Sequence, residues 1–68
     1  MLYDFIKPGD RVLHRCCNVE ATVVRVRAED SRDGRAYYCK LDFGRSVKGP
    51  FNIEMNGKEF RREALVLL

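Results

Sequence analysis

The sequence predicts an all-β domain built from about five short strands. Two observations favour this fold class. Residues with β-branched or aromatic side chains recur in short runs, and turn-forming residues separate those runs. A third observation excludes the main alternative, because no window of a dozen residues keeps apolar side chains at helical spacing. The pattern is typical of a small barrel or sandwich.

The first predicted elements are a turn, a strand and a loop. Pro8 fixes its own φ angle and Gly9 can adopt a left-handed conformation, so residues 8–10 predict a turn. Residues 11–14 then predict a first strand. Residues 15–20 lack both periodicity and an apolar run, and they predict a loop.

Residues 21–28 form the clearest predicted strand, because apolar and charged side chains alternate along it. The face that we expect to be buried comprises Val24, Val26 and Ala28. The face that we expect to be solvated comprises Val23, Arg25 and Arg27. This alternation fits an antiparallel sheet with one buried side and one solvated side.

A hairpin follows this strand. Residues 29–35 are polar apart from Gly34, and they predict a loop in which Asp33 and Gly34 provide the turn signal. Residues 36–43 predict the returning strand. Its expected buried face comprises Tyr37, Cys39, Leu41 and Phe43, and its other face comprises Tyr38, Lys40 and Asp42.

The remaining elements are read from glycine, proline and alternation. They are a loop at 44–50, a strand at 51–55, a type I′ turn candidate at Asn56-Gly57, a return at 58–60, a single helical or 3₁₀ turn at 61–64 and a closing strand at 65–68. We expect the core to contain Val12, Val24, Val26, Tyr37, Cys39, Leu41, Ile53, Met55, Phe60, Leu65 and Leu67.

Four short segments carry a resemblance to a known group of domains. They are PGDRVLH at 8–14, ATVVRV at 21–26, LDFG at 41–44 and the closing Leu65. Together they resemble Tudor-like domains of SH3-like barrel fold, such as the C-terminal domain of some bacterial DNA helicases and the polymerase-binding domain of CarD-type transcription regulators. The resemblance implies a single five-stranded SH3-like barrel over residues 1–68. It also implies a binding module that contacts a protein through a sheet edge, or sometimes nucleic acid.

Length and composition limit the possible functions. A domain of 68 residues buries too little to enclose a deep substrate pocket, so we expect no small-molecule substrate. The formal net charge is +3, from 13 basic and 10 acidic residues whose signs alternate along the chain, as an ordinary solvated surface does. No apolar run is long enough to span a membrane, and the first residues do not resemble a signal peptide, so we expect a cytoplasmic location and no membrane contact.

One group of residues has side chains of the types that bind metals or act as nucleophiles. It comprises His14, Cys16, Cys17 and, further along the chain, Cys39. Adjacent cysteines cannot easily both ligate one tetrahedral zinc ion, and the chain contains no C-x-x-C spacing. A Cys-His nucleophile would need a base within hydrogen-bond reach and a pocket. We therefore predict no enzyme activity, catalytic residue, cofactor or metal. Cys39 should be buried, and Cys16 and Cys17 should lie in an exposed loop.

Two surfaces remain as candidate binding sites. A basic and aromatic surface would comprise Arg25, Arg27, Tyr38, Lys40, Arg61 and Arg62. An apolar interface would comprise Leu2, Tyr3, Phe5 and Ile6. The sequence favours a non-enzymatic module that binds a protein partner or a second copy of itself. The alternative is a barrel that binds nucleic acid through its basic and aromatic face.

Overall fold

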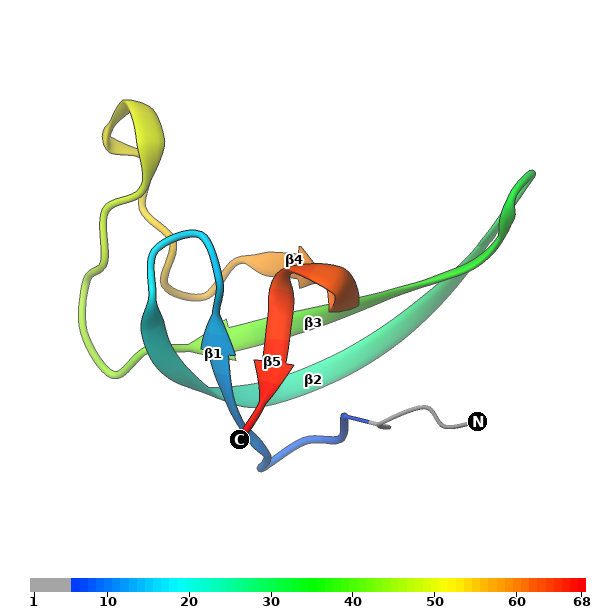
Figure 1. Ribbon diagram of the computed structural model, residues 1–68, viewed down its shortest axis with the longest axis horizontal. Coiled ribbons are helices and arrows are strands. Elements are labelled where there is room, and N and C mark those ends of the chain that lie inside the picture. Colours follow the sequence, from blue (N-terminus) through cyan, green and yellow to red (C-terminus); the bar gives the residue numbers. More distant parts are fainter. Residues whose placement is uncertain (1–5) are drawn as a thin grey trace.

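A computed structural model describes residues 6–68, and five strands form one antiparallel sheet in it, in the order β4-β3-β2-β1-β5 (Figure 1). The strands are β1 (Arg11–His14), β2 (Val19–Ser31), β3 (Gly34–Asp42), β4 (Glu59–Arg61) and β5 (Leu65–Leu67). Two single 3₁₀ turns, η1 (Pro50–Asn52) and η2 (Arg62–Ala64), are the only helical segments in the described residues. The predicted all-β class is confirmed, as are the 3₁₀ turn after β4 and the closing strand. A turn also forms at Asn56-Gly57, but it is not of the predicted type I′, because only Gly57 has a positive φ.

The hairpin of β2 and β3 extends far beyond the rest of the sheet and forms a projecting arm (Figure 1). The predicted loop at 29–35 is therefore wrong, because the paired strands continue to Ser31 and Gly34. The reversal needs only Arg32 and Asp33, since Gly34 adopts a φ of 116°. Polar residues are stable in this arm because both of its faces are exposed to solvent.

A β-bulge in β2 changes which side chains are buried. Val23 pairs with Leu41 and Arg25 pairs with Lys40, which leaves Val24 as an extra residue on its strand. The extra residue reverses the alternation, so Val23 is 1% exposed and Val24 is 49% exposed. The prediction that Val24 is buried and Val23 solvated is thus wrong.

Two other predicted core residues are exposed. Tyr37 lies on the arm, beyond the point where β4 ends its pairing with β3 at Tyr38, and it is 42% exposed. Ile53 is 53% exposed because the predicted strand at 51–55 does not form. Phe51 and Asn52 adopt left-handed φ angles of 58° and 60°, which are incompatible with an extended strand.

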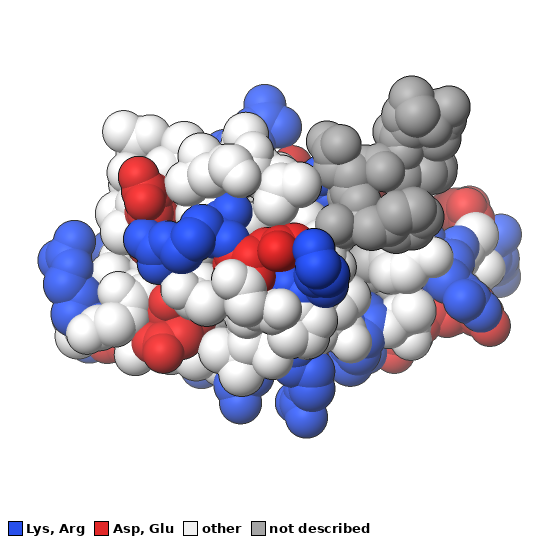
Figure 2. Space-filling model, turned by 90° about the horizontal axis from the view of Figure 1, so that it is seen from below, with Lys and Arg blue, Asp and Glu red and all other residues white. Residues whose placement is uncertain are grey.

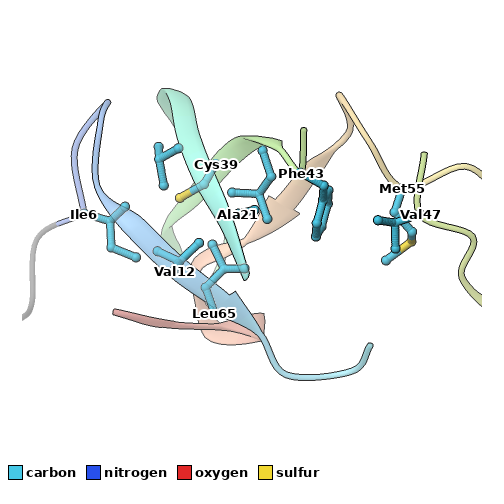
Figure 3. Close-up of a cluster of buried hydrophobic side chains, with 10 residues drawn as sticks. Ile6, Val12, Ala21, Cys39, Phe43, Val47, Met55 and Leu65 are labelled. Atoms are coloured by element: carbon cyan, nitrogen blue, oxygen red, sulfur yellow. The ribbon is translucent and has the colours of Figure 1, made fainter. Parts of the chain in front are cut away.

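The buried core lies between the crossing strands (Figure 3). Its members are Ile6, Val12, Ala21, Val23, Cys39, Leu41, Phe43, Val47, Met55 and Leu65. The predicted Val26, Phe60 and Leu67 are half-buried against this cluster. Val47 and Met55 lie together at one end of the cluster, at the base of the loop that follows β3 (Figure 3). That loop consequently has an apolar anchor of its own.

The edges of the sheet are the short strands β4 and β5. They sit at opposite ends of the strand order, and within residues 6–68 no ladder joins them. The five-stranded sheet is confirmed, whereas closure into an SH3-like barrel stays a prediction. In the same part of the chain, no helix has the length and apolar character needed to cross a membrane.

Candidate binding surfaces

Of the predicted N-terminal apolar interface, the structure describes only Ile6. Ile6 is 8% exposed and belongs to the core, because its side chain packs into the main apolar cluster (Figure 3). Leu2, Tyr3 and Phe5 lie outside the described residues. An exposed apolar surface is found elsewhere, on the loop between β3 and β4.

The tip of that loop presents Phe51 and Ile53 to solvent. Phe51 is 95% exposed, the most exposed of the large apolar side chains in residues 6–68. It lies within η1, at the turn of a small hairpin in which Lys48 bridges to Glu54. The N–H of Gly49 donates to the carbonyl of Ile53 at 2.8 Å, which closes this hairpin just below the tip. We call Pro50–Asn52 together with Ile53 the loop tip.

Glu54 holds the base of this small hairpin in place. Its carboxylate accepts hydrogen bonds from the Ser46 hydroxyl, from the Asn56 N–H at 3.0 Å and from the Val47 N–H at 2.9 Å. Lys48 adds an ion pair at 3.5 Å. These contacts, led by the Ser46 hydrogen bond, lower the pKa of Glu54 to about 2. The backbone on both sides of the loop tip is therefore fixed by hydrogen bonds to Glu54.

The second candidate surface lies across β2, β3 and β4 on the solvated side of the sheet. Strand pairing produces two neighbouring rows of side chains, Arg27–Tyr38–Arg61 and Arg25–Lys40–Glu59. Residues that are paired directly across strands share a face and lie about 5 Å apart. We call these six residues the basic face. The structure thus brings together five of the six residues predicted for the basic and aromatic surface.

Arginine side chains cover the ring of Tyr38. The guanidinium carbon of Arg27 lies 4.6 Å from the ring centroid, and that of Arg61 lies 5.8 Å from it. Both distances are within the range of cation–π attraction. A Tyr38 ring in this position is already occupied, so it orients the two arginines instead of offering a free platform for stacking.

Glu59 lies among the cations of the basic face. Its carboxylate accepts from the Nε atom of Arg27 at 3.0 Å to each oxygen, and a second guanidinium nitrogen approaches to 2.9 Å. The Arg27 hydrogen bond is the main cause of a lowered Glu59 pKa, and the positive charges of Arg25 and Lys40 lower it further. The Glu59 carboxylate thus interacts with three cations, Arg27, Arg25 and Lys40.

Arg62 is not part of the basic face. It begins η2, and its guanidinium donates to the carbonyl of Leu65 at 2.9 Å. Its positive charge also acts on the buried Cys39 thiol. These contacts place Arg62 against the 3₁₀ turn and the core, and they give it a structural role.

His14 is a buried residue of the core. It is 4% exposed, its ring meets Phe60 edge-on with a centroid separation of 4.5 Å, and Phe43 lies 6.5 Å away. The N–H of Cys17 donates to Nδ1 of His14 at 3.4 Å, so the neutral ring carries its proton on Nε2. In residues 6–68, no group of three or more His, Cys, Asp or Glu side chains is placed to hold a metal ion.

The three cysteines should differ strongly in reactivity. All three are free thiols. Cys16 is exposed and Cys39 is buried, as the sequence predicts. Cys17 lies in the same turn as Cys16, but it is half-buried against the core and not exposed as predicted. Burial also raises the pKa of Cys39, which reduces its thiolate fraction. We expect DTNB to modify Cys16 within seconds to minutes and Cys39 only after denaturant is added. Mass mapping of the labelled sites would contradict this if Cys39 reacted first in the native protein.

Two important residues were missed by the sequence reasoning. The alternating pattern predicts a strand at Phe51, although its neighbours Pro50 and Asn52 are both turn formers and favour a turn instead. For Glu59 the pattern predicts only a returning strand. Its place among the cations depends on the register between β3 and β4, which no local pattern gives.

Comparisons of the chain with family models, with curated proteins and with solved structures found no match.

Proposed function

We propose that this protein is a non-enzymatic binding module of SH3-like, Tudor-like type that holds a protein partner through its loop tip. The observation that carries the proposal is Phe51, which is 95% exposed and has a left-handed φ of 58°. The three unpaired cysteines fit a module that works in the reducing cytoplasm.

The conformational energy of Phe51 favours a role in binding over a role in stabilising the fold. A left-handed conformation costs a non-glycine residue about 1–2 kcal/mol. In a free monomer, the exposed Phe51 ring recovers little of this cost by burial. Backbone strain of this kind is concentrated at ligand clamps and other functional sites, where surrounding contacts maintain it. Here the maintaining contacts are those of Glu54 and the Gly49–Ile53 hydrogen bond.

The shape of the loop tip favours a protein as the partner. Phe51 and Ile53 project from a small hairpin, and a protruding apolar knob needs a concave site on another macromolecule. Aromatic side chains inserted into such pockets are the usual energetic centres of protein interfaces. The braced backbone lowers the entropy that binding would otherwise cost, because the loop is already ordered.

The test compares Phe51→Ala and Phe51→Gly with the unaltered protein. The partner is first captured by a photo-crosslinking phenylalanine analogue at position 51, with the analogue at Tyr37 on the exposed arm as the matched control. Its affinity is then measured by calorimetry. We expect each Phe51 variant to weaken binding by about 30-fold or more, the effect of a hot-spot residue. Neither variant should lower stability, and Phe51→Gly should raise it by up to about 1 kcal/mol, since glycine relieves the strained φ.

Crosslinking alone does not support the proposal, since any neighbour can be captured. If the captured partner binds Phe51→Ala as tightly as the unaltered protein, the loop tip is not its docking site. Sedimentation over a range of concentrations identifies whether the partner is a second copy. Self-association that Phe51→Ala abolishes supports the proposal with the chain as its own partner.

A further inference from the structure

The basic face has more positive charge than its own carboxylate can neutralise. Its two rows contain four cations and one anion, Glu59. Among the four cations, only Arg27 forms a salt bridge in the part of the chain that the structure describes. Arg25 and Arg61 are exposed and Lys40 is half-buried. Glu29 flanks the face on the arm side and pairs with Arg27 at 3.6 Å, and Asp42 flanks the face at the other end.

Charged side chains of both signs are present over much of the surface. On the face drawn in Figure 2, several acidic side chains lie beside basic ones. Other exposed pairs are likewise matched one to one, such as Arg11 with Glu20 at 3.1 Å and Arg35 with Asp30 at 3.0 Å. The excess of cations is therefore limited to the six residues of the basic face and is not a property of the three strands as a whole.

Glu59 marks where an external anion would bind. Arg27 grips both carboxylate oxygens, and the charges of Arg25 and Lys40 also lower the pKa of this carboxyl. A phosphate offers the same kind of oxygen acceptors, and arginine forks bind carboxylates and phosphates in similar bidentate geometry. Glu59 thus occupies the position of a bound anion and competes for Arg27.

We propose that the basic face binds the sugar-phosphate backbone of a nucleic acid, and that Glu59 restrains this binding by occupying Arg27. Arg25, Lys40 and Arg61 supply the available phosphate contacts. The occupied Tyr38 ring excludes base stacking at that site, so recognition is of the backbone and independent of base sequence. This surface is separate from the loop tip, and its function does not depend on a protein partner.

The strength of such binding should depend steeply on salt. With three or four phosphate contacts on a single strand, log K should fall with log salt at a slope of about −2 to −3. Affinity should therefore drop by about 20- to 50-fold between 50 and 200 mM salt. An apolar interface would show little of this dependence.

The decisive experiment uses Glu59→Gln, which removes the closer of the two carboxylates that pair with Arg27 while keeping the shape of the side chain. Fluorescence anisotropy would measure binding of labelled oligo(dT) and of a random-sequence duplex, each about 20 units long, over a salt series. We expect Glu59→Gln to bind about 3- to 10-fold more tightly, with a salt slope steeper by about 0.7 from one added contact. The double variant Arg25→Glu/Arg61→Glu should lose at least about tenfold.

Arg35→Glu is the matched control, because it reverses one exposed arginine on the arm, away from the basic face. Folding of every variant is checked by circular dichroism, and loss of an exposed pair such as Arg27–Glu59 should cost less than about 1 kcal/mol. Unchanged or weaker binding by Glu59→Gln overturns the proposal, as does an equal loss in Arg35→Glu. Displacement of the oligonucleotide by polyglutamate of equal charge, with equal potency, would assign the face to an acidic protein instead.

Discussion

Val23→Asp should unfold the domain, whereas Val24→Asp should leave it folded. The two side chains are adjacent in sequence, but Val23 is 1% exposed and Val24 is 49% exposed. A buried carboxylate with no partner is among the most destabilising single changes, and we expect a loss above about 4 kcal/mol. A domain of this size has only about 3–10 kcal/mol of stability in total. Val24→Asp should cost less than about 1 kcal/mol.

Urea denaturation followed by circular dichroism would measure both variants. Because Val23→Asp is expected to be unfolded even without urea, Val23→Thr provides a measurable companion. It keeps the volume of valine and adds one buried hydroxyl, which should cost about 1–3 kcal/mol. Val24→Thr should be within about 0.5 kcal/mol of the unaltered protein. A larger loss at position 24 than at position 23 would mean that the β-bulge is misplaced.

This contrast shows what alternation can and cannot predict. The pattern of β2 locates the strand and correctly assigns Arg25 and Arg27 to the solvated face. It fails at Val23 and Val24, because consecutive valines fit either register equally well. The bulge between them is set by pairing with Leu41 and Lys40 on β3, which is a long-range contact. After the bulge, Arg25 and Arg27 lie on the expected solvated face, and so the predicted basic residues do assemble. The expected buried face is only partly buried there, because Val26 is half-buried and Ala28, on the arm, is exposed.

Which residues of β3 belong to the core could not be predicted from the local sequence pattern either. Tyr37 and Cys39 occupy equivalent positions on one face of β3, and the sequence treats them alike. Cys39 is buried because Phe60 of β4 pairs with it, whereas β4 does not reach Tyr37. The end of β4 determines the point at which the hairpin of β2 and β3 becomes exposed on both faces. Neither the length nor the register of β4 can be read from the hairpin itself.

The candidate sites divide in the same way. Arg25, Arg27, Tyr38 and Lys40 were predictable as one surface, because alternation and hairpin pairing are local properties. The competing position of Glu59 was not, since it depends on the register of an edge strand. Phe51 lay in an apparently alternating segment, and its left-handed backbone is maintained by the hydrogen bonds of the surrounding loop.

Lowering the pH from 7 to 5 should destabilise the protein through His14. The ring is buried against Phe43 and Phe60, its Nδ1 atom accepts a backbone hydrogen bond, and burial lowers its pKa. In the unfolded chain the same ring has a pKa of about 6.5. Between the lowered pKa and 6.5, the unfolded state binds more protons than the folded state.

The direction of the effect follows from this difference. The free energy of unfolding should be constant with respect to His14 above pH 6.5, and it should fall as the pH decreases below that value. The slope can be at most about 1.4 kcal/mol per pH unit for one proton. The carboxylates of Glu54, Glu59 and Asp10 have lowered pKa values, so they act in a separate window. Their stabilisation is present above their usual pKa values near 4 and is lost as the pH falls further.

Two variants and one direct titration test this prediction. His14→Gln keeps an acceptor for the Cys17 N–H, and His14→Phe fills the same aromatic site; neither titrates. Urea denaturation at intervals between pH 7.5 and 5 should show a falling stability for the unaltered protein and a flat profile for each folded variant. His14 is the single histidine of the chain, so its ring resonances give an unambiguous pKa by NMR. A ring that titrates at or above 6.5, or variants that keep the slope, would contradict a buried neutral His14, because a ring that is charged as easily in the folded protein as in the unfolded chain cannot make folding depend on pH.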